Sequence, residues 1–291
     1  MPNLQDIRAR IASIGKTRKV VSAMKMVSAA KLARSTQAIQ SARPYAERMQ
    51  QVLASVTGGV EADAHPLLVP REAVRSLDLV VFTSDRGLCG PYNANVSRYA
   101  ARLIGERREA GVEQVSLVPV GRKGGEFLHK RRLGEIVRGF TGLSTVRPAH
   151  ASEIAEFLMA RYLAGESDEV VLVYANFASA LTQRPAHTAL LPVVPDVETP
   201  GSEPATAVAY EVEPSPEALL ALLVPRAVEF AVFRALLENQ AGEHGARMTA
   251  MDSATNNTTE LIHSLTLEYN KARQAAITAE LVEIVSGAEA L

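Results

Sequence analysis

The sequence of 291 residues has little of what several protein classes require. It contains no tryptophan and a single cysteine, Cys89, so it cannot form an intrachain disulfide or a cysteine-based structural zinc site. Aromatic residues make up 5%, which favours long helices over an aromatic-rich β-sandwich. No apolar run approaches the ~18 residues of a membrane span, so we expect no membrane insertion. Hydrophobic residues nevertheless reach 47%, enough for a sizeable core.

The net charge is only −1, which argues against general nucleic-acid binding. No aromatic residue precedes Tyr45 to stack on bases, so we expect no nucleic-acid partner. The near-neutral total hides an uneven distribution. Residues 1–50 contain ten Lys/Arg and two acidic residues, whereas residues 215–291 contain five Lys/Arg and ten acidic residues. The two ends of the chain are therefore complementary in charge.

The N-terminal segment has no proline and one glycine between residues 3 and 43. Its apolar residues have helical spacing, first at Leu4, Ile7, Ile11 and Ile14 and then at Val21, Met24 and Val27. We predict a helix over residues 4–56, roughly 80 Å long, with a slip in register between Ile14 and Val21. Pro44 is expected to kink this helix without ending it. A basic, serine-containing start also fits a transit peptide, but the helical pattern continues past any plausible cleavage point.

A second long helix is predicted from Ser215 to about Ser286, because Ser215, Pro216 and Glu217 form a typical helix start. Its seam has the alternating spacing of four and three residues of a left-handed coiled coil: His244, Met248, Met251, Thr255, Thr258, Ile262, Leu265, Tyr269, Ala272 and Ala276. We predict an antiparallel coiled coil of the two terminal helices. The alternative, two separate surface helices of a globular bundle, is disfavoured by their length.

The middle of the chain alternates short β-branched runs with helical stretches. Strands are predicted at 77–83, 115–120, 170–174 and 190–194, and helices at 93–108 and 152–163. This order predicts a small Rossmann-like α/β domain with a mainly parallel sheet. The predicted division is an N-terminal coiled-coil helix (1–56), a linker (57–75), the α/β domain (76–195), a second linker (196–214) and a C-terminal coiled-coil helix (215–291).

Two glycine-rich segments follow predicted strands, where an α/β fold places phosphate-binding turns. The first, SDRGLCG at residues 84–90, is followed by no GKS or GKT, and its Asp85 puts a negative charge where a phosphate would lie. We expect Asp85 to cap the following helix or pair with Arg86, and Gly87 and Gly90 to supply special backbone angles. The second, GRKGG at residues 121–125, is expected to be a solvated turn.

Other candidate sites have no support in the sequence. The six histidines show no metal-binding spacing, Cys89 lies in no recognisable Cys/His signature, and the pair Glu280 and Glu283 is most simply a solvated helix face. We therefore predict no cofactor and no metal, and no enzyme activity for the chain by itself.

Five segments resemble the gamma subunit family of the F-type ATP synthase. They are MKMVSAAKL (24–32), RPYAERM (43–49), SDRGLCG (84–90), ENQAGEHGARMTAMDSATNN (238–257) and YNKARQAAITAELVEIVSGA (269–288). The resemblance implies a non-catalytic central rotor that couples ion flow through the c ring to ATP synthesis or hydrolysis at the beta subunits. It implies alpha, beta and epsilon subunits and the c ring as partners, and a peripheral position on the cytoplasmic face of the bacterial inner membrane.

The same resemblance assigns rotor–stator contacts to Met24, Lys25, Arg247, Arg273, Gln274, Thr278 and Glu280. The chain departs from the family where Pro91 and Tyr92 replace the usual glycine and leucine, and where Gly242 and Gly245 replace serine and alanine, which could soften the helix. The two-cysteine insertion of chloroplast members is absent. The alternative function is an α/β ligand-binding module with a coiled-coil dimerisation arm.

Overall fold

The computed structural model describes residues 3–57, 64–143, 145–194 and 215–289. The long helices are α1 (Leu4–Thr57) and α5 (Pro216–Glu289). Between them lie β1 (Ser76–Phe82), α2 (Tyr92–Glu109), β2 (Gln114–Val120), α3 (Arg122–Arg131), β3 (Glu135–Ile136), α4 (Pro148–Leu163), β4 (Glu169–Phe177) and β5 (Gln183–Leu191). The predicted second linker, 196–214, lies outside the described residues.

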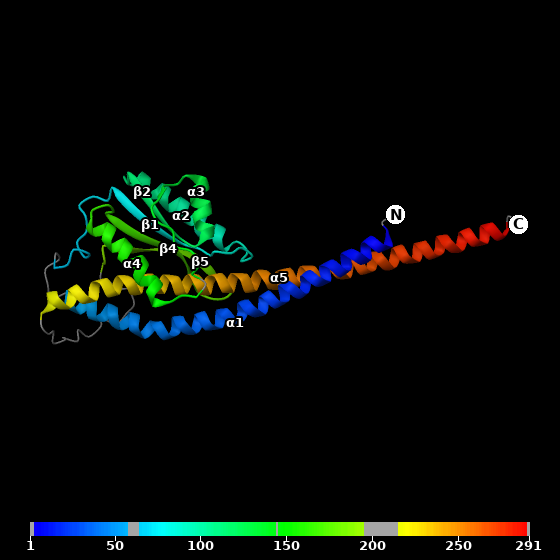
Figure 1. Cartoon of the computed structure of the whole chain (residues 1–291), viewed down its shortest axis with the longest axis horizontal. Helices are drawn as coiled ribbons and strands as arrows, with labels where there is room; N and C mark the ends of the chain where they lie inside the picture. Colours follow the sequence, from blue (N-terminus) through cyan, green and yellow to red (C-terminus); the bar gives the residue numbers. More distant parts are fainter. Residues whose placement is uncertain (1–2, 58–63, 144, 195–214, 290–291) are drawn as a thin grey trace.

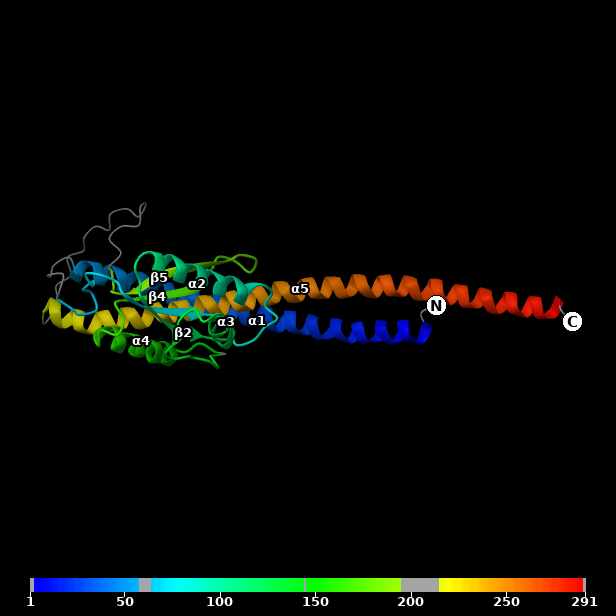
Figure 2. The same ribbon diagram turned by 90° about the horizontal axis from the view of Figure 1, so that it is seen from above.

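The two terminal helices form the predicted antiparallel coil, which we call the shaft (Figures 1 and 2). Lys25 pairs with Asp252, and Ser35 donates a hydrogen bond to Gln240, so residue numbers rise on one helix as they fall on the other. All ten residues of the predicted α5 seam are buried or half-buried, which confirms that seam. Pro44 lies within α1, and the helix continues past it.

The seam of α1 corrects one prediction. It keeps the alternating spacing of four and three residues without a slip from Leu4 to Val56, and every residue on it is buried or half-buried. Between Ile14 and Leu32 the seam positions are Arg18, Val21, Lys25 and Ser28, of which three are polar. Ser28 and Ser35 are 3% and 4% exposed, whereas Val27, expected on the seam, is 57% exposed. The hydrophobic pattern misled here because Arg18, Lys25, Ser28 and Ser35 occupy seam positions without being apolar.

The central domain is built on one five-stranded sheet of order β3-β2-β1-β4-β5. Strand β1 pairs in parallel with β2 and β4, and β2 with β3, which confirms the mainly parallel sheet. The edge strand β5 is antiparallel to β4. The strand predicted at 190–194 is wrong in its position, because β5 lies at Gln183–Leu191 and its polar, half-exposed residues hid it. GRKGG is not a solvated turn, since it starts α3.

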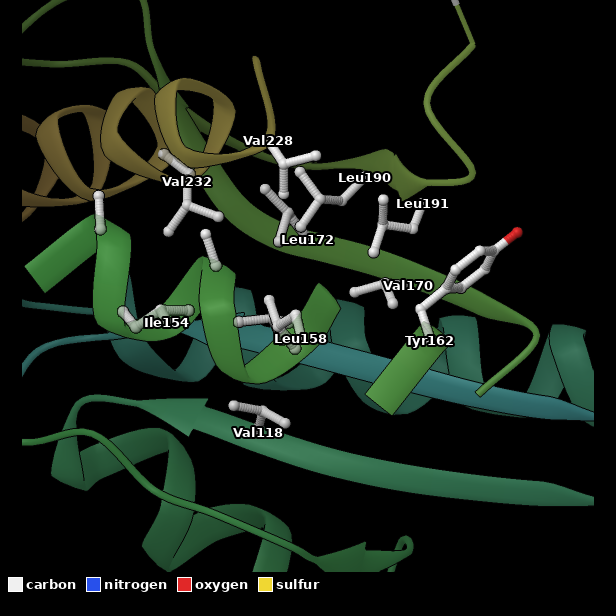
Figure 3. Close-up of a cluster of buried hydrophobic side chains, with 14 of the residues drawn as sticks. Val118, Ile154, Leu158, Tyr162, Val170, Leu172, Leu190, Leu191, Val228 and Val232 are labelled. Carbon is white, nitrogen blue, oxygen red and sulfur yellow. The ribbon is translucent and has the colours of Figure 1, made fainter. Parts of the chain in front are cut away.

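The sheet is covered on both faces. On one face, the buried residues of β1, β2, β4 and β5 pack against α4 and against residues 220–236 of α5 (Figure 3). On the other face, a second set of buried residues from β1, β2 and β4 packs against α2 and α3. Side chains from α1, including Leu53 and Val56, join the first of these cores. The shaft helix α5 therefore serves as one of the covering helices of the α/β domain, which fastens the domain to the shaft.

Candidate functional site

The residues expected to contact a stator lie in two places on the shaft. Met24, Lys25 and Arg247 lie where the shaft passes the SDRGLCG loop, and Met24 and Arg247 line one groove between α1, α5 and that loop. Arg273, Gln274, Thr278 and Glu280 lie near the free end of α5 and are exposed. The structure therefore does not bring the seven residues into one site.

Lys25 and Arg247 both form ion pairs within the chain. The ammonium of Lys25 pairs with Asp252 across the shaft. The guanidinium of Arg247 contacts a carboxylate oxygen of Glu243 at 2.7 Å and donates to the carbonyl oxygen of Gly87 at 3.2 Å. Arg247 thus ties α5 to the loop that follows β1.

The end of α5 extends beyond α1 (Figures 1 and 2). The guanidinium of Arg8 lies 5.8 Å from the ring centroid of Tyr269, near the start of α1, and α5 continues to Glu289. Thr278 donates to the carbonyl oxygen of Gln274 in its own helix, at 2.9 Å. Large apolar side chains are about half exposed or more on this tip: Ile277, Leu281, Val282, Ile284 and Val285. An uncovered apolar helix end is typical of a surface that a partner covers.

The basic face of α1 is largely unpaired. Among the described side chains, Lys25 is the one basic residue of α1 that forms an ion pair with α5. The exposed basic residues of α1 include Arg10, Lys16, Lys19, Lys31 and Arg34. The complementary charges predicted from the sequence thus form one ion pair between α1 and α5 among the described side chains. Most of the basic residues of α1 face outward instead.

The SDRGLCG loop is held by its own side chains, in a different way from the prediction. Both carboxylate oxygens of Asp85 accept backbone N–H groups, Oδ1 from Arg122 and Oδ2 from Gly142, each at 2.9 Å. Asp85 therefore caps α3, 37 residues away, and the expected cap of α2 and pairing with Arg86 are both wrong. The side chain of Asn93 instead accepts the N–H of Ser84 at 2.9 Å.

The backbone of the loop differs from the prediction at one glycine. Gly90 has the expected positive φ of 57°. Gly87 does not, and Leu88 takes a left-handed φ of 62° instead. The side chain of Leu88 is 63% exposed, so it faces outward from this turn.

A second contact between domain and shaft was missed by the sequence analysis. Tyr92, at the start of α2, is 3% exposed, and its hydroxyl lies 2.8 Å from Oδ1 of Asn239 and 3.0 Å from the carbonyl oxygen of Asn239. Nδ2 of Asn239 in turn donates to the carbonyl oxygen of Thr83, at 3.2 Å. Two unusual residues, Tyr92 and Gly242, were visible in the sequence, but nothing there showed that they touch.

Gly242 and Gly245 are points of close approach. A Cβ atom on Gly242 would lie 2.9 Å from Cε2 of Tyr92, and one on Gly245 would lie 3.2 Å from the Cα of Ala180. Helix α5 runs without a break through both glycines. Their small size thus lets Tyr92 of α2 and the loop at Ala180 approach the backbone of α5 directly.

Two buried groups at the contact between domain and shaft, His244 and Tyr92, have shifted pKa values. Burial, with the nearby charges of Arg247 and Lys31, lowers the pKa of His244 to about 4, so its imidazole is neutral at neutral pH. Burial, followed by the nearby negative charges of Glu243 and Glu238, raises the pKa of Tyr92 well above its usual value. Tyr92 therefore keeps its proton and remains a hydrogen-bond donor.

Among the residues that the structure describes, no group of His, Cys, Asp and Glu side chains could hold a metal ion. In the same residues, no helix combines the length and the apolar character that a membrane span requires.

Comparisons with known proteins agree over the whole chain. The family profile described as ATP synthase matches residues 3–291. The ATP synthase gamma chain of Anaeromyxobacter sp. (strain Fw109-5) is 50% identical over 296 residues, covering 100% of both chains. That of Geobacter sp. (strain M21) is 49% identical, covering 100% of this chain and 99% of its own.

Solved structures share the fold. The central stalk and c ring structure of the Tetrahymena thermophila mitochondrial ATP synthase contains a chain with a TM-score of 0.60 and 26% identity, covering 81% of this chain and 99% of its own. A chain of the Euglena gracilis mitochondrial ATP synthase has a TM-score of 0.66 at 19% identity, covering 99% of this chain and 94% of its own.

Proposed function

This chain belongs to the ATP synthase gamma chain family, and we propose that it works as the central rotor of that complex, coupling ion flow through the c ring to ATP synthesis or hydrolysis by rotation. The chain is thus a subunit of an enzyme complex. The observation that carries the proposal is the shape of the molecule: a long two-helix shaft has a domain fastened at one end and an uncovered apolar helix tip at the other.

The finer assignments are also part of the proposal. The chain has no catalytic centre of its own and turns inside a ring of alpha and beta subunits. Its α/β domain contacts the epsilon subunit and the c ring. The complex holds it peripherally on the cytoplasmic face of the bacterial inner membrane. The chain divides into five parts: two shaft helices (1–56 and 215–291), two linkers (57–75 and 196–214) and the α/β domain (76–195).

We propose different roles for the two groups of stator-contact residues. Arg273, Gln274, Thr278 and Glu280 are exposed on the α5 tip and can touch surrounding loops directly. Lys25 pairs with Asp252 and Arg247 bonds the carbonyl oxygen of Gly87. Their proposed role is therefore indirect: they hold the two shaft helices and the adjacent loop in place. Met24 is half-buried beside them and completes that surface.

The exposed basic face of α1 supplies the test. We propose that it faces acidic loops of the beta subunits. Single exposed pairs contribute only ~0–1 kcal/mol, so one charge reversal should have little effect. Reversing Arg10, Lys16 and Lys19 together to Glu should weaken assembly with purified alpha and beta subunits, or lower the ATP hydrolysis rate of the assembled complex.

A matched control reverses three exposed basic residues of the α/β domain, namely Lys130, Arg132 and Arg184. In a complex of alpha, beta and this chain without the c ring, the control should assemble and hydrolyse ATP normally. If the unmodified chain forms a stable homodimer and ignores alpha and beta, the alternative of a ligand-binding module with a dimerisation arm replaces the rotor.

A further inference from the structure

Segments of the α/β domain form hydrogen bonds with the face of α5 between Glu238 and Thr249, and we call this set of contacts the grip. These segments come from the carboxyl ends of β1 and β4. After β1, the chain contacts α5 through Gly87 and Tyr92. After β4, the carbonyl oxygen of Ala180 accepts a hydrogen bond from Thr249 at 3.2 Å. This polar grip lies beside the apolar core that α5 shares with the sheet.

Within the grip, Tyr92 makes the contact that constrains geometry most. Its hydroxyl proton is shared between two oxygens of Asn239, and the amide of Asn239 reaches the carbonyl oxygen of Thr83. These hydrogen bonds link the start of α2, the end of β1 and α5 in one closed path. Because the Tyr92 hydroxyl keeps its proton, this path does not open near neutral pH.

The ring of Tyr92 lies directly on the backbone of α5 at Gly242. A Cβ atom on residue 242 would lie 2.9 Å from Cε2 and 3.1 Å from the hydroxyl oxygen of Tyr92, closer than such atoms pack. Glycine inside a helix destabilises it relative to alanine, so this site gains nothing from glycine except room for the ring. Tyr92 and Gly242 are therefore a matched pair.

The contacts of the grip and of the apolar core differ in what they can resist. The close-packed apolar core between α4, the sheet and residues 220–236 of α5 holds the domain on the shaft, and its interdigitated side chains already resist movement of one against the other. Hydrogen bonds need a donor and an acceptor in line, and a ring seated on a glycine can occupy one place along the helix. The second kind of contact therefore adds a directional constraint against rotation of the domain about α5 to the resistance that the packed core supplies.

We propose that Tyr92, seated on Gly242 and bonded to Asn239, is the positioning residue that fixes the angle of the α/β domain on the shaft and carries torque between them. This rests on the proposed rotor function. The expected consequence is mechanical: weakening the pair makes the joint between domain and shaft softer to twisting while the active sites of the beta subunits are unaffected.

The test measures torsional stiffness in a complex assembled from this chain with alpha and beta subunits. A bead is attached to the α/β domain through a cysteine introduced by Arg98→Cys at an exposed position of α2; Cys89, which is 1% exposed, should not react. The spread of bead angles in a stalled complex reports stiffness. We expect Tyr92→Leu to lower stiffness at least twofold with ATP hydrolysis per complex unchanged. Tyr92→Phe, which keeps the ring, should retain more stiffness than Tyr92→Leu.

The control is Val232→Ala, which removes a fully buried apolar contact between α5 and the same domain. It should lower the melting temperature and reduce stiffness less than Tyr92→Leu does. Gly242→Ala should soften the joint when Tyr92 is present and have little further effect in the Tyr92→Leu background. If Gly242→Ala fails to fold, the Tyr92 variants decide alone.

Unchanged stiffness in Tyr92→Leu, or an equal loss in Val232→Ala, overturns the proposal while leaving the rotor function intact. Failure of the unmodified chain to assemble with alpha and beta overturns the proposed function instead.

Discussion

Asp85 offers the sharpest test of how the SDRGLCG loop works. If the loop is architectural, its carboxylate should matter for stability and no nucleotide should bind there. Asp85 is half-buried, and its two oxygens accept the N–H groups of Arg122 and Gly142 at 2.9 Å each. Replacing Asp85 by Ala removes both hydrogen bonds and leaves the start of α3 uncapped.

The expected cost follows from those two bonds. Loss of a helix N-cap costs about 1 kcal/mol, and loss of a hydrogen bond to a charged group costs about 1.5 kcal/mol where water can partly replace it. Together they give about 2.5 kcal/mol for Asp85→Ala. For a domain of this size, each kcal/mol lowers the melting temperature by about 2–4 °C, so the expected shift is about 5–10 °C.

The assay combines thermal denaturation with hydrogen exchange. Exchange of the amide hydrogens of Arg122 and Gly142 should speed up in Asp85→Ala, since these are the two donors that lose their acceptor. Arg86→Ala is the matched control, because Arg86 is adjacent and exposed. Equal melting temperatures for the two variants, or submillimolar binding of ATP, ADP or NAD by calorimetry, would refute the architectural reading.

Two further predictions concern the shaft. Met24→Lys adds a charge beside the groove shared with Arg247, where it can pair with an acidic loop of a beta subunit and hold one rotor angle too tightly. In reconstituted vesicles, ATP hydrolysis should persist while proton pumping per ATP falls, and an unchanged ratio would contradict this. His244 has a pKa of about 4 in the folded chain, against an ordinary value of 6.5 in the unfolded chain. Between these two pH values the unfolded chain therefore binds one proton more than the folded chain. The free energy of unfolding should therefore fall by about 2–3 kcal/mol as the pH drops from 6.5 to 4, and His244→Gln should flatten that part of the curve.

The sequence predicted the architecture well where hydrophobic periodicity was strong. Both terminal helices, the α5 seam and the parallel strands follow from spacing alone. The α1 seam was misread because Arg18, Lys25, Ser28 and Ser35 carry no hydrophobic signal. Their unbroken spacing of four and three residues was present in the sequence, and extending the pattern past Ile14 would have found them.

The joint between domain and shaft could not be read in the same way. Asp85 was expected to cap the nearest helix, yet its partners lie 37 and 57 residues away. Tyr92 and Asn239 are separated by 147 residues. A single sequence carries no signal that shows which residues so far apart in the chain are in contact. The carboxyl edge of the sheet, where α/β folds usually bind a ligand, instead receives the side chain of Asn239 from α5.

The pairing of the two ends of the chain has a consequence for biosynthesis. Lys25 and Asp252 are 227 residues apart, so at ~5–20 residues per second the first helix leaves the ribosome about 10–45 s before its partner exists. An isolated amphipathic helix is marginally stable in water, and its apolar stripe stays uncovered during that interval. The shaft therefore closes only after translation is nearly complete, and the α/β domain between the two helices can fold its sheet first. Until α5 is made, the apolar stripe of α1 and the sheet face that residues 220–236 cover both lack their partner.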